Sequence, residues 1–255
     1  MHEAHTWWTT IAGAEAWFSQ FAARFSHPEF EVDHVSWEVS GVEESGWALA
    51  TARLDGCADL AEARLVAEAE VRVLSGLGRL LWEGIPPIRP VLLIRVNNKR
   101  FVEGAILAVP QIAIVIGRTP IGVEERILTS AEPSGRLRED VIGRMKSDGL
   151  SRALELYGRE QPNWGSLYKV YELLRERFSE DRLVSTGFVS KQDLARFRAT
   201  ANLPDLSGID ARHAAGSRDA PKALEFREAH AMVRNLLASW LGGTIADDSE
   251  GEHGT

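Results

Sequence analysis

Residues 34–54 have the sequence HVSWEVSGVEESGWALATARL, which predicts a β-hairpin. Apolar and polar side chains alternate along residues 34–40, and residues 46–54 repeat the pattern, as is typical of two strands with one buried face. Residues 41–46 lie between them and combine two glycines with a polar run, which indicates the turn. This hairpin decides the fold class of the first half of the chain, because it requires a sheet.

The elements on either side of the hairpin complete an α+β pattern. Residues 6–25 carry apolar side chains at helical spacing, and residues 59–81 predict a longer helix that ends before a Gly-Ile-Pro-Pro sequence. Residues 90–95 and 102–116 are rich in β-formers and flank two asparagines, which indicates a second hairpin. We therefore expect a small antiparallel sheet with helices packed on one face.

The second half of the chain predicts a different kind of domain. Residues 130–135 form a polar, Pro- and Gly-containing boundary, and helical periodicity dominates after it. We therefore predict an α+β domain over residues 1–130, a helical bundle over 134–242 and a disordered acidic tail over 243–255. Within the bundle, Trp164, Tyr168 and Tyr171 have the spacing of a buried helix face, so core packing is favoured over base stacking.

Composition excludes several classes of protein. The 255 residues are 44% hydrophobic and 26% charged, which is typical of a globular protein. Cys57 is the only cysteine, so no intramolecular disulfide is possible. The N-terminus resembles no signal peptide and no apolar run is long enough to cross a bilayer, so we expect a cytoplasmic protein without a membrane partner.

The acidic net charge is distributed unevenly. The total is −8, of which residues 1–130 carry −6, residues 131–240 carry +2 and residues 241–255 carry −4. The sequence therefore argues against strong non-specific binding to nucleic acid, but it leaves room for a local phosphate site in the second half.

Several catalytic signatures are missing from the sequence. It contains no P-loop, no Gly-x-Ser-x-Gly elbow and no paired cysteines of a zinc site, and the short Gly76-Leu-Gly78 sequence interrupts a predicted helix. We accordingly expect no cofactor and no metal.

His213 is the best candidate among the seven histidines for acid–base chemistry. It lies in a polar segment between two predicted helices, with Arg212 beside it and Asn202 upstream at a helix end. An arginine can stabilise charge on a phosphate. The alternative interpretation is that Arg212 and His213 only tie the loop to the helix ends through hydrogen bonds. Incidental or structural roles suit the other six histidines better.

Four segments carry a resemblance to a known family: residues 164–172, residues 197–202, residues 211–214 and the tryptophan-ended final helix. Together, over residues 135–241, their layout is similar to the HEPN helical domains of bacterial toxin–antitoxin and phage-defence systems. The resemblance implies a helical bundle and, in active members, metal-independent ribonuclease activity through an Arg-x4–6-His motif.

The candidate site follows from this resemblance together with the loop chemistry. Arg212 adjoins His213 instead of preceding it by several residues, so the family spacing requires Arg198 or Asn202 to pair with His213 across a longer loop. The candidate catalytic residues are His213, Arg212 and Asn202, and the expected partner is RNA or a nucleotide, in a stress or defence role. Whether the chain is an enzyme stays open. A non-catalytic interaction module, with a homodimer formed through the helical domain, is the alternative, and a small-molecule enzyme in the first half is a weaker one.

Overall fold

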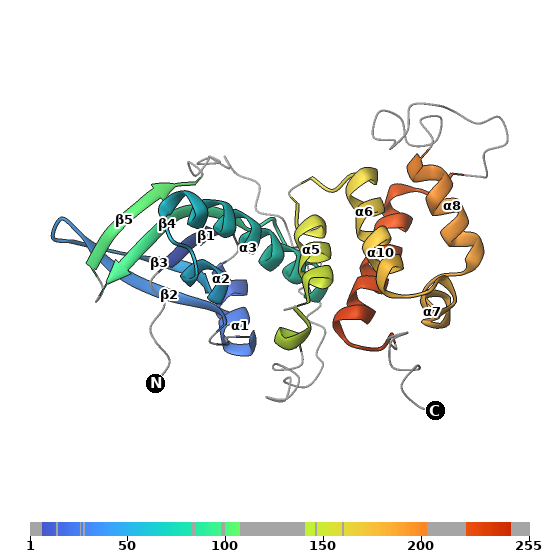
Figure 1. Cartoon of the computed structure of the whole chain (residues 1–255), viewed down its shortest axis with the longest axis horizontal. Coiled ribbons are helices and arrows are strands. Elements are labelled where there is room, and N and C mark those ends of the chain that lie inside the picture. The colour runs from blue at the N-terminus through green and yellow to red at the C-terminus, as the bar shows by residue number, and fades with distance from the viewer. Residues whose placement is uncertain are drawn as a thin grey trace, which may run out of the picture. The chain divides into compact units, whose positions relative to one another are not determined.

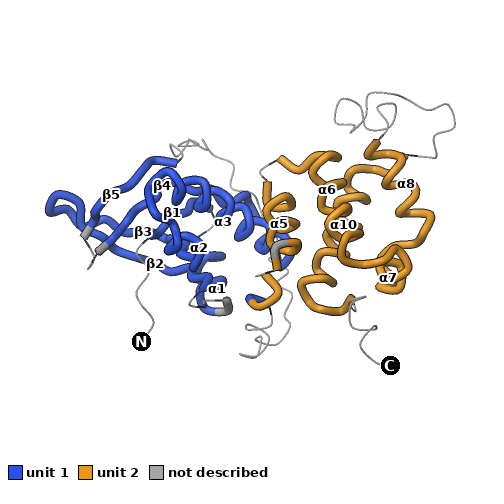
Figure 2. The backbone as a smooth tube through the Cα atoms, in the orientation of Figure 1, with its two compact units in different colours: residues 1–142 blue, residues 143–255 orange. Residues whose placement is uncertain are grey.

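The protein forms two compact units, residues 1–142 and residues 143–255 (Figure 2). The computed structural model describes residues 7–13, 15–25, 27, 29–82, 85–97, 100–107, 141–145, 147–159, 161–202 and 223–245. The predicted boundary at residues 130–135, the second part of the strand expected to end at 116, and most of the acidic tail lie outside these ranges. The predicted fold class, α+β with a sheet followed by helices, is confirmed.

The described residues of the first unit form a five-stranded sheet and three helices, α1 to α3, whose arrangement is drawn in Figure 1. The strands are β1 (Trp7–Ala12), β2 (Phe30–Val39), β3 (Val42–Thr51), β4 (Arg89–Asn97) and β5 (Arg100–Ile106). The helices are α1 (Glu15–Phe25), α2 (Ala52–Asp55) and α3 (Leu60–Leu81). The strand order β1-β3-β2-β5-β4 closes into a barrel, since β1 pairs with both β3 and β4. All pairs are antiparallel except the contact between β2 and β5.

Strand β1 replaces the first half of the helix predicted over residues 6–25. Trp7–Ala12 is extended, and the helix begins only at Glu15. Both neighbours of β1 are far away in sequence, because Thr9 lies opposite Leu49 and Leu93. Helical spacing of apolar residues was therefore misleading here, and long-range pairing of a segment rich in Thr and Trp decided its conformation.

The hairpin quoted from the sequence is confirmed, with a shorter turn than predicted. Ser40 and Gly41 alone form the turn, with φ of 53° and 82°. Two consecutive residues with positive φ match the tight turn that suits the twist of a hairpin. Residues 42–46, expected in the turn, instead form the first half of β3.

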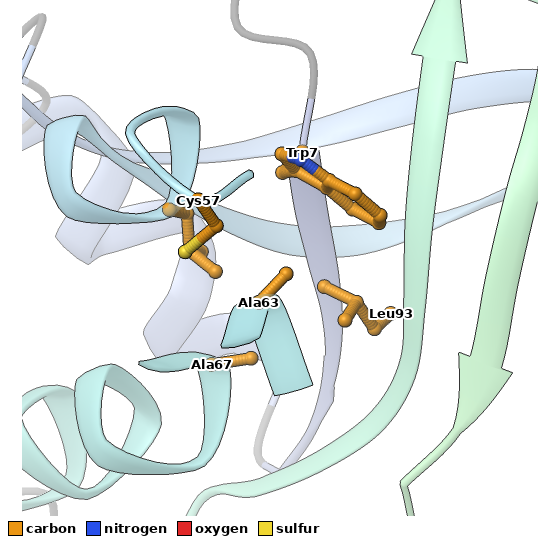
Figure 3. Packing of buried hydrophobic residues seen from close by; sticks show 6 residues of the cluster. Trp7, Cys57, Ala63, Ala67 and Leu93 are labelled. Carbon is orange, nitrogen blue, oxygen red and sulfur yellow. The ribbon is translucent and has the colours of Figure 1, made fainter. Parts of the chain in front are cut away.

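Helix α3 covers one face of the sheet. Leu49 on β3 and Leu93 on β4 both lie opposite Thr9 on β1, so the three side chains point to the same side. Ala63 and Ala67 of α3 pack with Leu93 in one buried cluster (Figure 3). Small side chains on the helix allow its backbone to approach the sheet closely.

Helix α1 covers the same face as α3. Trp47 lies two residues before Leu49 and therefore points to the same side of β3. Phe18 of α1 packs against Trp47 with ring centroids 6.1 Å apart, and Phe21 packs against Phe30 at 6.2 Å. Both long helices thus lie on one face, as the element order predicts.

The second unit is helical in its described part. Its helices are α5 (Asp148–Tyr157), α6 (Trp164–Arg177), α7 (Glu180–Ser185), α8 (Lys191–Asn202) and α10 (Phe226–Leu241). The short helix α7 was not predicted from the sequence. Helical periodicity predicts the final helix over residues 221–241, but α10 begins at Phe226, where Glu225 and Glu228 form a capping box.

Aromatic rings connect three helices of this unit. Trp164 of α6 contacts Phe197 of α8 and Phe226 of α10, with centroids 6.1 and 5.5 Å apart. Tyr171 is fully buried and packs on Phe197 at 5.3 Å. Tyr168 is half-buried and stacks on the same ring. The prediction that these aromatic residues serve the core is confirmed for Trp164 and Tyr171.

In the described part of the chain, no helix has the length and apolar character required to span a membrane.

Candidate functional site

Asn202 is the last residue of helix α8. The other end of this helix is fixed by Ser190, the residue directly before it. The Asp193 N–H donates to Ser190 Oγ, and Ser190 N–H donates back to the Asp193 carboxylate, each at 3.1 Å. Asn202 Oδ1 is buried and has no hydrogen-bond partner among the described residues. A buried acceptor without a partner is energetically costly, so this oxygen is a candidate acceptor for a hydrogen bond from a ligand or from another part of the chain.

Both ends of the segment that carries Arg212 and His213 are fixed at helix α8. The segment leaves the helix after Asn202 and returns at residues 223–224. There, the Leu224 N–H donates to the buried Thr200 Oγ1 at 2.9 Å, and Arg196 donates to the Ala223 carbonyl at 3.2 Å. Helix α8 therefore anchors both the start and the end of residues 203–222.

Arg212 and His213 themselves lie outside the described residues. Of the three predicted catalytic residues, the structure places only Asn202. The convergence of the three side chains therefore stays a prediction, and its one structural support is the common anchor at the end of α8.

Arg198, the alternative arginine for this site, is already engaged within the bundle. Its Nη1 donates to Glu180 Oε2 at 2.6 Å and to the Tyr171 hydroxyl at 3.3 Å. The Arg198 side chain is 31% exposed and the Glu180 side chain is 28% exposed. An arginine that joins α8 to α6 and α7 in this way has a structural role, and it could contact a phosphate only by giving up part of this network.

The network shifts the pKa of two of its members. Burial raises the pKa of Tyr171, and the nearby Arg198 guanidinium offsets part of that rise. For Arg198, burial alone would lower the pKa, but the hydrogen bond to Glu180 and its neighbours outweigh this and the pKa is raised. Tyr171 is therefore neutral and Arg198 charged at physiological pH, so neither exchanges protons there.

The described histidines have structural surroundings. His230 of α10 stacks on the buried Tyr157 with ring centroids 5.1 Å apart. His34 meets Trp47 edge-on at 5.6 Å, and His27 Nδ1 accepts the Glu29 N–H at 3.2 Å. These contacts agree with the sequence-based preference for structural roles.

Metal-binding and thiol chemistry have little support in the described ranges. No group of three or more His, Cys, Asp or Glu side chains among those residues is arranged to hold a metal ion. Cys57 is a buried free thiol that donates to the Arg53 carbonyl at 3.3 Å. Burial first, and the nearby Glu62 carboxylate second, raise the pKa of this thiol, so it is a poor nucleophile.

The first unit exposes apolar side chains that the sequence analysis did not single out. They are Val39 and Val42 on either side of the hairpin turn, and Val102 and Ile106 on β5. Val39 and Val42 lie directly opposite each other, and the pairing of Glu38 with Arg100 brings the start of β5 next to this hairpin end. The sequence contains one signal for this exposed surface, because Val39 and Val42 flank the Ser40-Gly41 turn at positions where polar residues are usual.

Comparison with known proteins assigns no family to this arrangement. No protein-family model, no curated protein and no solved structure matches the chain.

Proposed function

We propose that this chain is a binding protein that docks another polypeptide on the sheet of its first unit. One observation carries the proposal: four of the six large hydrophobic side chains exposed in the described part of the chain lie on three strands of this sheet. Val42, Val102 and Ile106 are 59%, 53% and 67% exposed. Large apolar side chains exposed on neighbouring strands are typical of an interaction surface.

The energetic argument concerns the cost of this exposure. Burying a valine or isoleucine side chain fully stabilises a structure by about 1.5–3 kcal/mol. Strands β2, β3 and β5 leave this gain unused, although the same sheet buries Val32, Leu49 and Leu93 completely. A partner that covers the exposed residues would recover that free energy.

Site-specific crosslinking tests the proposal. A photoreactive phenylalanine analogue replaces Val42, Val102 or Ile106, one at a time, in the full-length protein inside cells. Leu65 is the matched control, since it is 70% exposed but lies on helix α3. We expect one and the same polypeptide to crosslink to the three sheet positions and not to position 65.

The captured polypeptide is then purified and its affinity measured directly. We expect Val102→Asp to raise the Kd at least about tenfold and Leu65→Asp to leave it nearly unchanged. Crosslinks that differ between the three sheet positions, or equal effects of the two substitutions, would overturn the proposal.

A second candidate function is contact with RNA or a nucleotide at the end of α8. Its support is the unpartnered Asn202 Oδ1 and the anchoring of residues 203–222 beside it. In this function the RNA 2′-hydroxyl attacks the adjacent phosphorus and the bond to the 5′-oxygen breaks, which leaves a 2′,3′-cyclic phosphate. His213 takes the proton of the 2′-hydroxyl or donates one to the leaving 5′-oxygen, and Arg212 stabilises charge on the phosphate.

Labelled RNA incubated with the protein in EDTA tests the second function. We expect wild type to cleave the RNA and His213→Ala to lose cleavage, with Asn202→Ala reduced. A homogeneous preparation in which wild type and His213→Ala cleave equally would eliminate His213 as the catalytic group. Absence of both cleavage and binding would eliminate the function.

A further inference from the structure

Strand β2 belongs to a closed barrel, but it pairs with its neighbour β5 only near one end, so among the described residues the middle of one side of β2 is unpaired. On one side it pairs with β3 from Phe30 to Val39. On the other side the described pairings lie at its two ends, where Phe30 pairs with His27 and Glu38 pairs with Arg100 of β5. A long strand edge of this kind is a template for another strand, and most proteins cover or guard it.

A side chain guards the open side of β2. The His34 N–H donates to the carboxylate of Asp33 at 2.7 Å, so it is directed away from β3. Because backbone groups alternate along a strand, Val32 and Ser36 direct theirs to the same side. This is also the side on which Glu38 pairs with β5. The exposed Asp33 carboxylate therefore protects this edge from pairing, in the place where other proteins use a proline or a bulge.

The hairpin around this edge carries charge of one sign. Residues 25–52 contain six acidic side chains and no lysine or arginine. Glu38 lies directly opposite Glu43, and both are exposed. Like charges facing each other across two strands destabilise the pair, so an approaching cation would relieve repulsion here.

From these observations we infer that the open side of β2 accepts a cationic strand from another polypeptide. The inference rests on the proposed binding function and specifies the partner's chemistry. A lysine or arginine of the incoming strand takes the Asp33 carboxylate. The His34 N–H is then released to join the new ladder, together with the backbone of Val32 and Ser36. Backbone bonds supply affinity and the acidic side chains select a basic sequence.

A second copy of this chain is the wrong occupant for the edge. Parallel in-register pairing of two β2 strands would place Asp33 beside Asp33 and Glu38 beside Glu38, and antiparallel pairing centred on residue 33 would place the two Asp33 residues opposite each other. Opposite charges across strands contribute about 0.2–1 kcal/mol per pair, and like charges oppose pairing. The acidic edge therefore disfavours self-association and favours a basic partner.

A synthetic peptide tests the inference on the full-length protein. The probe is the fluorescein-labelled, amidated peptide KTKVKTKVK, and its Kd is measured by fluorescence anisotropy at low and high salt. A control peptide carries proline in place of every threonine and valine, which keeps the five lysines but cannot form a strand ladder. We expect the first peptide to bind at low salt and the control peptide to bind at least about tenfold more weakly.

Two protein variants with equal changes in net charge complete the design. Asp33→Lys reverses the charge on the edge, and Glu176→Lys does the same on an exposed position of α6 in the other unit. We expect Asp33→Lys to raise the Kd at least about tenfold and Glu176→Lys to leave it within about twofold. Circular dichroism verifies that both variants are folded. On peptide addition, hydrogen exchange at the Val32 and Ser36 amides should slow.

Each contrary outcome overturns the inference. Equal binding of the two peptides, or equal effects of the two variants, would reduce the interaction to charge attraction without strand addition. If wild type ignores the peptide while Asp33→Ser forms dimers, Asp33 only prevents self-association. Failure of the peptide together with crosslinks at Val42, Val102 and Ile106 would leave the proposed binding function standing and remove this inference alone.

Discussion

The indole of Trp17 lies directly against the backbone of Gly78, where helix α1 crosses helix α3. A Cβ atom added to Gly78 would lie 2.7 Å from Trp17 Cζ2. The indole has little room to move, because Phe21 and Trp82 each pack against it with ring centroids 5.2 Å away. Gly78 therefore sets how closely the two helices approach.

We expect Gly78→Ala to lower the free energy of unfolding by about 1–3 kcal/mol, because overpacking a filled core forces side chains and backbone to shift. Without the packing conflict, alanine would stabilise the helix by about 1 kcal/mol relative to glycine. The sign of the change in the free energy of unfolding therefore shows whether the contact with Trp17 dominates. Urea unfolding followed by tryptophan fluorescence measures it. Gly143→Ala is the control, since a Cβ there meets nothing within 4 Å. A Gly78→Ala protein as stable as wild type would contradict the packing described.

Replacing Arg198 with methionine should destabilise the second unit by about 1.5–3 kcal/mol, the range for hydrogen bonds to charged groups. The substitution leaves Glu180 and the Tyr171 hydroxyl without their donor. Chemical unfolding is measured for Arg198→Met, for Glu180→Gln and for the protein that carries both substitutions. Comparison of the three with wild type gives the coupling energy between Arg198 and Glu180. Lys191→Met, which breaks the fully exposed pair with Asp181, should cause no measurable change.

Tyr171 makes the stability that this network contributes depend on pH. Its pKa is raised in the folded protein, chiefly by burial, so its contribution to stability is present below the pKa of an unfolded tyrosine. That contribution is lost as the pH rises through the folded value. Because Arg198 lowers the pKa, Arg198→Met should raise it further, and ultraviolet titration of tyrosinate measures the change. A lower pKa in the variant would contradict the assignment.

Thr200→Val should lower the free energy of unfolding by about 1–3 kcal/mol, because it leaves the buried Leu224 N–H without its acceptor. Thr200→Ser keeps the hydroxyl and should lose less. The Leu224 amide should also exchange faster with solvent in the valine variant alone. Equal exchange in both variants would indicate that Thr200 does not anchor this end of the segment.

Glu43→Lys should stabilise the first unit by about 0.2–1 kcal/mol, since it converts a like-charged pair with Glu38 into an attractive one. Thermal unfolding at low ionic strength measures the gain, which high salt should reduce. Glu176→Lys on helix α6 controls for the change in net charge. A destabilised Glu43→Lys protein would show that the two carboxylates do not interact across the hairpin.

Local sequence signals predicted the elements whose patterns agree with their surroundings. Helix α3, after its Asp59 cap, follows its predicted range closely, and the hairpin of β2 and β3 lies where the sequence predicts it, although its turn is shorter. The error at Trp7–Ala12 has a physical cause: its apolar residues fit a helix and a strand alike, and only pairing with β3 and β4 distinguishes the two.

The candidate site was less accessible to sequence reasoning. Asn202 was correctly placed at a helix end, but nothing local indicates that Thr200 and Arg196 hold the returning chain. Likewise, the sequence offers Arg198 as a free cation, whereas its partners Glu180 and Tyr171 come from other helices. Hydrogen bonds between residues far apart in the chain leave no periodic trace.

The sequence by itself determined the α+β class, the hairpin, the helical second half and the acidic character of residues 25–52, because these depend on composition and short-range periodicity. Tertiary structure alone decided that β1 joins the sheet, that β2 keeps an open side, and that Glu38 faces Glu43. The first two relationships arise from the order of strands, which depends on contacts between segments up to about ninety residues apart rather than on any local preference, and the third arises from the hairpin register that the Ser40-Gly41 turn sets.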